Sequence, residues 1–108
     1  MPRSKTPSHD PRLDTIAPLV DQKKIVTLGD IFHFVPRTTV AKHIGVDGKT
    51  FHSRLLDPEA LTILQIHRMA DLFSLSRETM YDLVRAHIRE IKKGDWRMPA
   101  LDYKGRKI

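Results

Sequence analysis

The feature that most limits how this chain can fold is a short segment, residues 40–51, whose residue types match the corner between two packed helices. A small residue lets the helices approach, a glycine accepts the left-handed backbone that ends the first helix, and an aspartate caps the second. Apolar residues after the glycine and four residues after the aspartate attach the corner to a core. The residues at these positions are Ala41, Gly45, Val46, Asp47 and Phe51. We therefore expect two short helices joined by a tight turn.

Apolar residues at helical spacing predict one helix before this corner and one on each side of its turn. The first begins at Thr27, with Asp30 at the capping-box position, and it stops before Pro36, because a residue that precedes proline leaves the α region. The second covers residues 38–44. The third runs to residue 56, and Pro58 prevents its continuation.

Two more helices follow the corner. Thr62 and Gln65 form a capping box that opens a fourth helix, and Ser76 caps a fifth, which stops at residues 92–94 with two lysines and a glycine. No segment shows the two-residue alternation of a strand. The sequence therefore predicts an all-α fold, a compact domain of five short helices that covers residues 23–93.

The two ends of the chain differ from this domain in composition. Residues 1–22 hold four of the seven prolines and few apolar side chains, so we expect a flexible arm there. Residues 94–108 form a basic tail with interleaved aromatic residues, which is a composition that can bind a phosphate backbone and stack on bases. Trp96 and Met98 can instead fold back onto the domain or onto a second subunit, and we favour this interpretation.

Charge is informative only where it is local. The chain has 19 Lys and Arg against 13 Asp and Glu, a formal net charge of +6, and a basic balance favours an acidic partner such as nucleic acid. Most of the excess lies in the two ends. Within the expected domain, residues 37–54 carry four basic residues and one acidic residue, whereas residues 55–91 carry more acidic residues than basic ones. The positive charge of the domain thus coincides with the helix corner.

A corner of this kind with positive charge on it is typical of a helix-turn-helix, whose second helix enters the major groove of DNA. We therefore interpret residues 37–56 as a helix-turn-helix. Residues 27–91 further resemble the lambda-repressor-like domain of the Cro/C1 (XRE) transcriptional regulators. The resemblance is carried by two segments, Val40-Ala-Lys-His-Ile-Gly-Val46 and Ile66-His-Arg-Met-Ala-Asp-Leu-Phe-Ser-Leu-Ser76. It implies five helices, of which the second and third bind DNA. The chain departs from the family at Arg54, where an apolar residue is usual and Leu55 takes over the packing.

The resemblance also implies which residues meet DNA. The residues implied to contact base edges are Gly48, Lys49, His52 and Ser53. Lys49 donates to guanine O6 or N7 and Ser53 or His52 to a neighbouring edge, whereas Gly48 has no side chain to read a base with and allows close approach. The residues implied to contact phosphates are Arg37, Thr39, Lys42, Thr50, Arg54 and Thr62, the last through its backbone N–H.

The expected function is sequence-specific binding to double-stranded DNA by a cytoplasmic transcriptional regulator of repressor type. Operators with two-fold symmetry imply that it acts as a homodimer on a partly palindromic site. The apolar stripe of residues 80–91 exceeds what one small domain needs, so part of it is a candidate dimer surface. The alternative is a protein-interaction module, such as an antitoxin or a phage accessory protein, whose main contact is another protein.

Several other classes of function lack the residues they need. The chain has no cysteine, which excludes disulfides and thiolate metal sites, and its six histidines show no metal-ligand spacing. It has no nucleophile elbow, glycine-rich phosphate loop or pair of acids, so we expect neither an enzyme nor a bound cofactor or small-molecule ligand. No apolar run approaches the length of a membrane span, and no secretory signal is visible, so we expect no membrane association.

Overall fold

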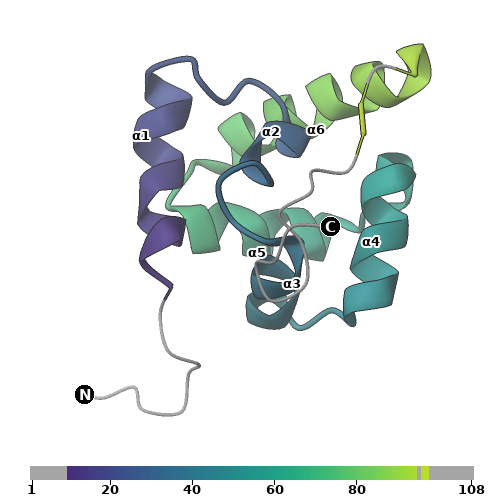
Figure 1. Cartoon of the computed structure of the whole chain (residues 1–108), viewed down its shortest axis with the longest axis horizontal. Coiled ribbons are helices and arrows are strands. Elements are labelled where there is room, and N and C mark those ends of the chain that lie inside the picture. The colour runs from purple at the N-terminus through teal and green to yellow at the C-terminus, as the bar shows by residue number, and fades with distance from the viewer. Residues whose placement is uncertain (1–9, 95, 98–108) are drawn as a thin grey trace.

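Helices are the only regular secondary structure in the described residues, as the periodicity predicts. The computed structural model describes residues 10–94 and 96–97, and Figure 1 shows their arrangement. The elements are η1 (Pro11–Thr15), α1 (Ile16–Asp21), α2 (Leu28–Ile31), α3 (Arg37–Ile44), α4 (Gly48–Leu56), η2 (Pro58–Ala60), α5 (Ile63–Phe73) and α6 (Arg77–Lys93). The all-α prediction is confirmed, although this part of the chain has six α-helices and two short 3-10 helices where the sequence predicts five helices. In the same residues, no helix is both long and apolar enough to cross a membrane.

The predicted caps fix where the helices begin. At the start of α2 the Asp30 N–H donates to Thr27 Oγ1 (3.2 Å), and Asp30 Oδ2 accepts from the Thr27 N–H (3.1 Å). The reciprocal bonds between Thr62 and Gln65, both 3.0 Å long, open α5 in the same way. Ser76 accepts from the Thr79 N–H at 3.0 Å and opens α6. Each cap satisfies N–H groups that have no partner within the helix.

The first predicted helix is shorter than its apolar pattern indicates. It begins after Thr27 as predicted, but α2 ends at Ile31, and residues 32–35 form turns. The Phe32 N–H bonds back to Gly29 rather than to the residue four before it, so the chain tightens and leaves the α-helix. Val35, which precedes Pro36, is still buried. The turns therefore keep the apolar residues inside without a continuous helix.

The expectation of a flexible arm over residues 1–22 is wrong for residues 11–21, and the domain begins before residue 23. These residues form η1 and α1, and both Leu13 and Ile16 are buried in the core. Asp10 caps η1 by accepting from the Arg12 N–H at 2.9 Å. The prolines do not prevent helix formation, because Pro11 and Pro18 stand in first turns, where a helix needs no N–H donor. Residues 1–9 lie outside the described residues.

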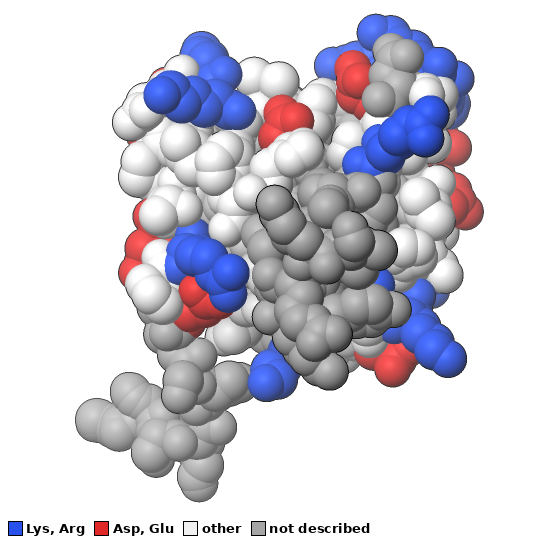
Figure 2. All heavy atoms as spheres, viewed as in Figure 1, with Lys and Arg blue, Asp and Glu red and all other residues white. Residues whose placement is uncertain are grey.

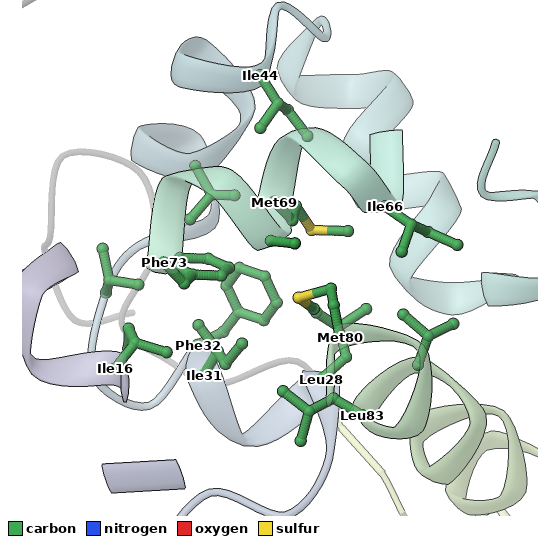
Figure 3. Packing of buried hydrophobic residues seen from close by; sticks show 14 of the residues in the cluster. Ile16, Leu28, Ile31, Phe32, Ile44, Ile66, Met69, Phe73, Met80 and Leu83 are labelled. Carbon is green, nitrogen blue, oxygen red and sulfur yellow. The ribbon is translucent and has the colours of Figure 1, made fainter. Parts of the chain in front are cut away.

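The buried hydrophobic residues form one core. In Figure 1, α1 and α4 stand on opposite sides, with α5 and α6 between them. Figure 3 shows side chains of α5 and α6 meeting those of α2 and of the turn that follows it, among them Met69, Phe73, Met80 and Phe32. Burial of each such side chain contributes about 2 kcal/mol to folding. The core therefore holds α3 and α4 on a rigid base.

Candidate nucleic-acid interface

The turn between α3 and α4 has the geometry that the sequence predicts. Gly45 ends α3 with φ of +74°, in the left-handed region, and the Val46 N–H donates to the Ala41 carbonyl at 2.9 Å. A side chain at Gly45 would have adequate space, since its Cβ would lie 3.5 Å from the nearest side-chain atom, Arg68 Nη1. The backbone conformation, rather than a lack of space, therefore favours glycine.

Arg68 of α5 braces the same turn from the outside. Its Nη1 donates to the Ile44 carbonyl at 3.0 Å. The carbonyls in the last turn of a helix have no partner within that helix, so this contact satisfies one of them and ties α3 to α5. The sequence pattern gives no sign of this bond, because it joins residues 24 positions apart.

Buried residues fasten α4 to this base. Phe51 and Leu55 are both buried, and Phe51 meets Phe32 edge to face with ring centroids 5.8 Å apart. Ala41 is buried where α3 packs on α4. Leu55 packs inward while Arg54 is half-buried, so the register expected from the departure at Arg54 agrees with the observed burial. The outer face of α4 is thereby fixed in direction.

The N-terminus of α4 is capped as predicted. Asp47 accepts hydrogen bonds from the N–H groups of Lys49 (3.1 Å) and Thr50 (3.2 Å). Gly48 is the first residue of the helix, and a Cβ there would meet nothing within 4 Å. The carboxylate thus holds the first turn of α4 in place while leaving the space around Gly48 open.

A stripe along α4 points away from the core. Lys49 and Ser53 are exposed, His52 is half-buried between them, and Leu56 continues the stripe with 49% of its surface exposed. These four residues are spaced three, four and seven apart, so they share one helical face. Three of the four residues expected at base edges therefore lie together with Leu56, which is not among the predicted contacts although its spacing indicates the same face.

His52 is harder to protonate than an ordinary histidine. Burial lowers the pKa of His52 below its usual value, and the positive charge of Arg37 lowers it further. Its Nδ1 is buried and has no hydrogen-bond partner among the described residues. A neutral imidazole has one donor and one acceptor, so His52 suits hydrogen bonding to a base edge better than attraction to a phosphate.

Arg37 and Thr62 do not fit the phosphate contacts expected of them. Arg37 is only 7% exposed, and its Nε and Nη1 atoms are buried. The backbone N–H of Thr62 already donates to Gln65 Oε1, because Thr62 is the N-cap of its own capping box. Arg37 and Thr62 both lie at helix starts, where a sequence pattern alone does not show whether a group is buried, engaged in a cap or exposed.

The other residues expected at phosphates remain near the surface. Lys42 is exposed on α3, and Thr39 is half-buried, with its carbonyl bonded to His43 Nδ1 at 2.9 Å. Thr50 and Arg54 are half-buried on the flank of α4, and Arg54 Nε lacks a hydrogen-bond partner within the described part of the chain. Lys42 therefore has the most accessible cation of this group.

Basic side chains also occur outside the corner. On the face in Figure 2, Lys and Arg side chains stand at several separate places, and they are dense at the upper right, where α6 ends. Lys92 and Lys93 are exposed there, and Lys92 Nζ lies 3.6 Å from a carboxylate oxygen of Glu59 in η2. The positive charge of the folded part is thus not confined to α3 and α4.

Trp96 folds back onto the domain, as the favoured interpretation of the tail expects. Its ring lies against Gly29 of α2 and meets the ring of His87 edge to face, with centroids 4.7 Å apart. Met98 lies outside the described residues. Among residues 10–94 and 96–97, no three His, Cys, Asp or Glu side chains are grouped so that they could hold a metal ion.

Comparisons with protein-family models, with curated proteins and with solved structures gave no match to this chain. The functional interpretation therefore depends on the geometry of α3 and α4.

Proposed function

We propose that this protein binds double-stranded DNA in a sequence-specific manner, as a transcriptional regulator of repressor type with α4 in the major groove. The proposal follows from the way α4 is held. Phe51 and Leu55 fix one side of the helix in the core, while Lys49 and Ser53 are exposed on the other side. A rigid helix that presents short polar and basic side chains is the element that direct readout requires. The Cro/C1 resemblance of the two quoted segments supports the same function.

Each residue on the outer face has a role in this proposal. Lys49 donates to guanine O6 or N7, Ser53 and the neutral ring of His52 bond to neighbouring base edges, and Leu56 contacts a thymine methyl group. Gly48 lets the backbone approach the groove edge, since the space beside it is open. Lys42 contacts a phosphate and, like other phosphate contacts, contributes affinity without reading sequence.

We also propose that two copies act together. A single short helix reads few base pairs, and a two-fold dimer doubles the site and explains partly palindromic operators. The proposal predicts two half-sites separated by about one helical turn of DNA.

A selection experiment tests this function. Random duplexes are selected on the protein at fixed salt, and the affinity of the selected duplex is then measured for Lys49→Ala and Ser53→Ala. Lys24→Ala is the matched control, because it removes the same charge from an exposed position outside the corner. We expect Lys49→Ala to weaken binding by about tenfold, as loss of one good base contact does, and Lys24→Ala to change it little.

Two results would overturn the proposal: no duplex binding at low salt, or Lys49→Ala and Ser53→Ala proteins that bind the selected duplex as tightly as the wild type. The protein-interaction module then becomes the better explanation. One observation favours it as the second candidate: Ile63 and Leu64, at the start of α5, expose 63% and 56% of their surfaces. Neighbouring exposed apolar side chains are typical of protein contacts.

A further inference from the structure

His87 is a buried polar residue that joins α6 to the end of α4. It has no exposed surface, and its Nε2 lies 2.8 Å from the Leu55 carbonyl oxygen. A carbonyl only accepts hydrogen bonds, so Nε2 must carry the proton, and the neutral ring has its lone pair at Nδ1. The contact spans 32 residues of sequence.

The Leu55 carbonyl belongs to the last turn of α4, where backbone acceptors lose their helical donors. Pro58 follows the helix and has no N–H to donate. The Asp57 N–H bonds to Ser53, one turn earlier. The histidine therefore satisfies an acceptor at the end of α4, one residue before Leu56 on the outer face.

The surroundings of His87 disfavour a second proton on the ring. Nδ1 is buried without a hydrogen-bond partner among the described residues, and the Trp96 ring packs edge to face at 4.7 Å. Burial lowers the pKa of His87. It outweighs three contributions that favour the cation, which are the bond to the Leu55 carbonyl of α4 and the charges of Asp30 of α2 and Glu90 of α6.

We propose that His87 is the positioning residue for the C-terminal end of α4, and that protonation of His87 releases this end and weakens duplex binding. The second half rests on the proposed function. A protonated ring gains an N–H at Nδ1 with no acceptor among the described residues, so the ring leaves its site. This movement breaks the bond to Leu55 and loosens Trp96.

The sign of the effect separates His87 from every surface histidine. Protonation of an exposed histidine adds positive charge and strengthens attraction to DNA. Protonation of His87 weakens binding, because it frees the end of the helix. A loss of affinity on acidification that His87→Gln abolishes therefore indicates the buried residue.

The experiment compares variants of the full chain. His87→Gln keeps an N–H donor near the position of Nε2 and does not titrate, whereas His87→Phe keeps a ring against Trp96 but has no donor. His33→Gln is the matched control at an exposed histidine. Affinity for the selected duplex is measured at constant salt from about pH 7.5, above the ordinary histidine pKa, down to about pH 5, because the pKa of His87 lies below that ordinary value. Amide hydrogen exchange of residues 54–57 is measured in the DNA-free protein, with the middle of α5 as the internal reference.

We expect the wild type and His33→Gln to lose several-fold in affinity towards acid pH, and His87→Gln to lose none. We expect His87→Phe to speed exchange at residues 54–57 relative to α5 at neutral pH, and His87→Gln to restore slow exchange. An unchanged acid response in His87→Gln, or slow exchange at residues 54–57 in His87→Phe, overturns the inference. If the wild type binds no duplex, the proposed function and the pH-release step both fail, and the exchange data alone decide whether His87 positions the end of α4.

Discussion

Trp96 lies so close to Gly29 that a Cβ at the glycine would be 2.2 Å from the indole Nε1. The indole thus occupies the space that a side chain at position 29 would need, and the same ring packs edge to face on His87. Trp96, which follows the end of α6, is therefore part of the packing of the domain.

Gly29→Ala is expected to displace Trp96 and destabilise the fold by about 1–3 kcal/mol, the usual cost of overpacking. Trp96 is the single tryptophan of the chain, so its emission should shift to longer wavelength as the ring becomes solvated. Denaturant unfolding gives the free energy. Gly48→Ala is the control, since a Cβ there meets nothing within 4 Å. Equal stability of the wild type and Gly29→Ala would contradict the close packing.

Gly45→Ala should destabilise the domain by about 1 kcal/mol, because alanine adopts a positive φ at a cost. Gly94, at the end of α6, has nearly the same φ of +75°, so Gly94→Ala serves as the matched variant. Both changes should lower the melting temperature, which differential scanning calorimetry measures. Only Gly45→Ala should weaken duplex binding, because only Gly45 orients α4. Equal binding by the two variants would indicate that the corner is not involved.

The free energy of unfolding should decrease as the pH is lowered through the range in which histidine titrates. The pKa of His87 is lowered in the folded protein, chiefly by burial, so the unfolded chain takes up the proton at higher pH. The stability is fully present above about pH 6.5, the ordinary histidine value, and is lost as the pH falls towards the folded pKa. The pKa of His52 is also lowered by burial, so His52 contributes to the pH dependence of stability in the same direction. Urea unfolding across this range measures the effect, and His87→Gln should flatten it. If the stability of His87→Gln depends on pH as steeply as that of the wild type, another group causes the pH dependence.

Thr62→Ala should cost about 1 kcal/mol, the usual loss for an N-cap, because the Gln65 N–H then loses the Thr62 hydroxyl at the start of α5. Thr62→Ser keeps the hydroxyl and should be close to the wild type. Thermal unfolding followed by circular dichroism distinguishes them. If both variants unfold at the same temperature, the capping box contributes little.

Lys42 and Lys49 should differ in how their loss affects binding. Lys42→Ala removes a phosphate contact, so it should weaken binding to all duplexes alike and reduce the slope of log affinity against log salt by about 1. Lys49→Ala should instead relax the preference for one base pair. Titrations of matched and mismatched duplexes at several salt concentrations separate these outcomes, and identical behaviour of the two variants would contradict the assigned roles.

Local signals in the sequence were sufficient for most of the fold. Capping residues such as Asp47 and Ser76 accept hydrogen bonds from N–H groups two or three residues further along the chain, so the sequence pattern alone predicts these helix starts. The proline content of residues 1–22 predicts disorder and not the helices η1 and α1, because the effect of a proline depends on which turn of a helix it occupies. Leu13 and Ile16 are spaced three apart, and that spacing was the available signal.

The site was less accessible to sequence reasoning, because it depends on distant contacts. Exposure of Lys49 and Ser53 follows from their spacing relative to Phe51. The burial of Arg37 does not, since it depends on what packs over the start of α3. The bonds from Arg68 to Ile44 and from His87 to Leu55 join residues 24 and 32 positions apart, and no local pattern indicates them.

Two of the packing contacts have a consequence for how the chain acquires its shape during synthesis. The first described elements pack against the last ones, η1 against α5 and α2 against α6. As the chain leaves the ribosome, η1 lacks its contacts with α5, and α2 lacks its contacts with α6, until those helices have emerged. Fragments that stop before α6 should therefore remain unfolded, and the domain should form in a single cooperative step once α6 has emerged.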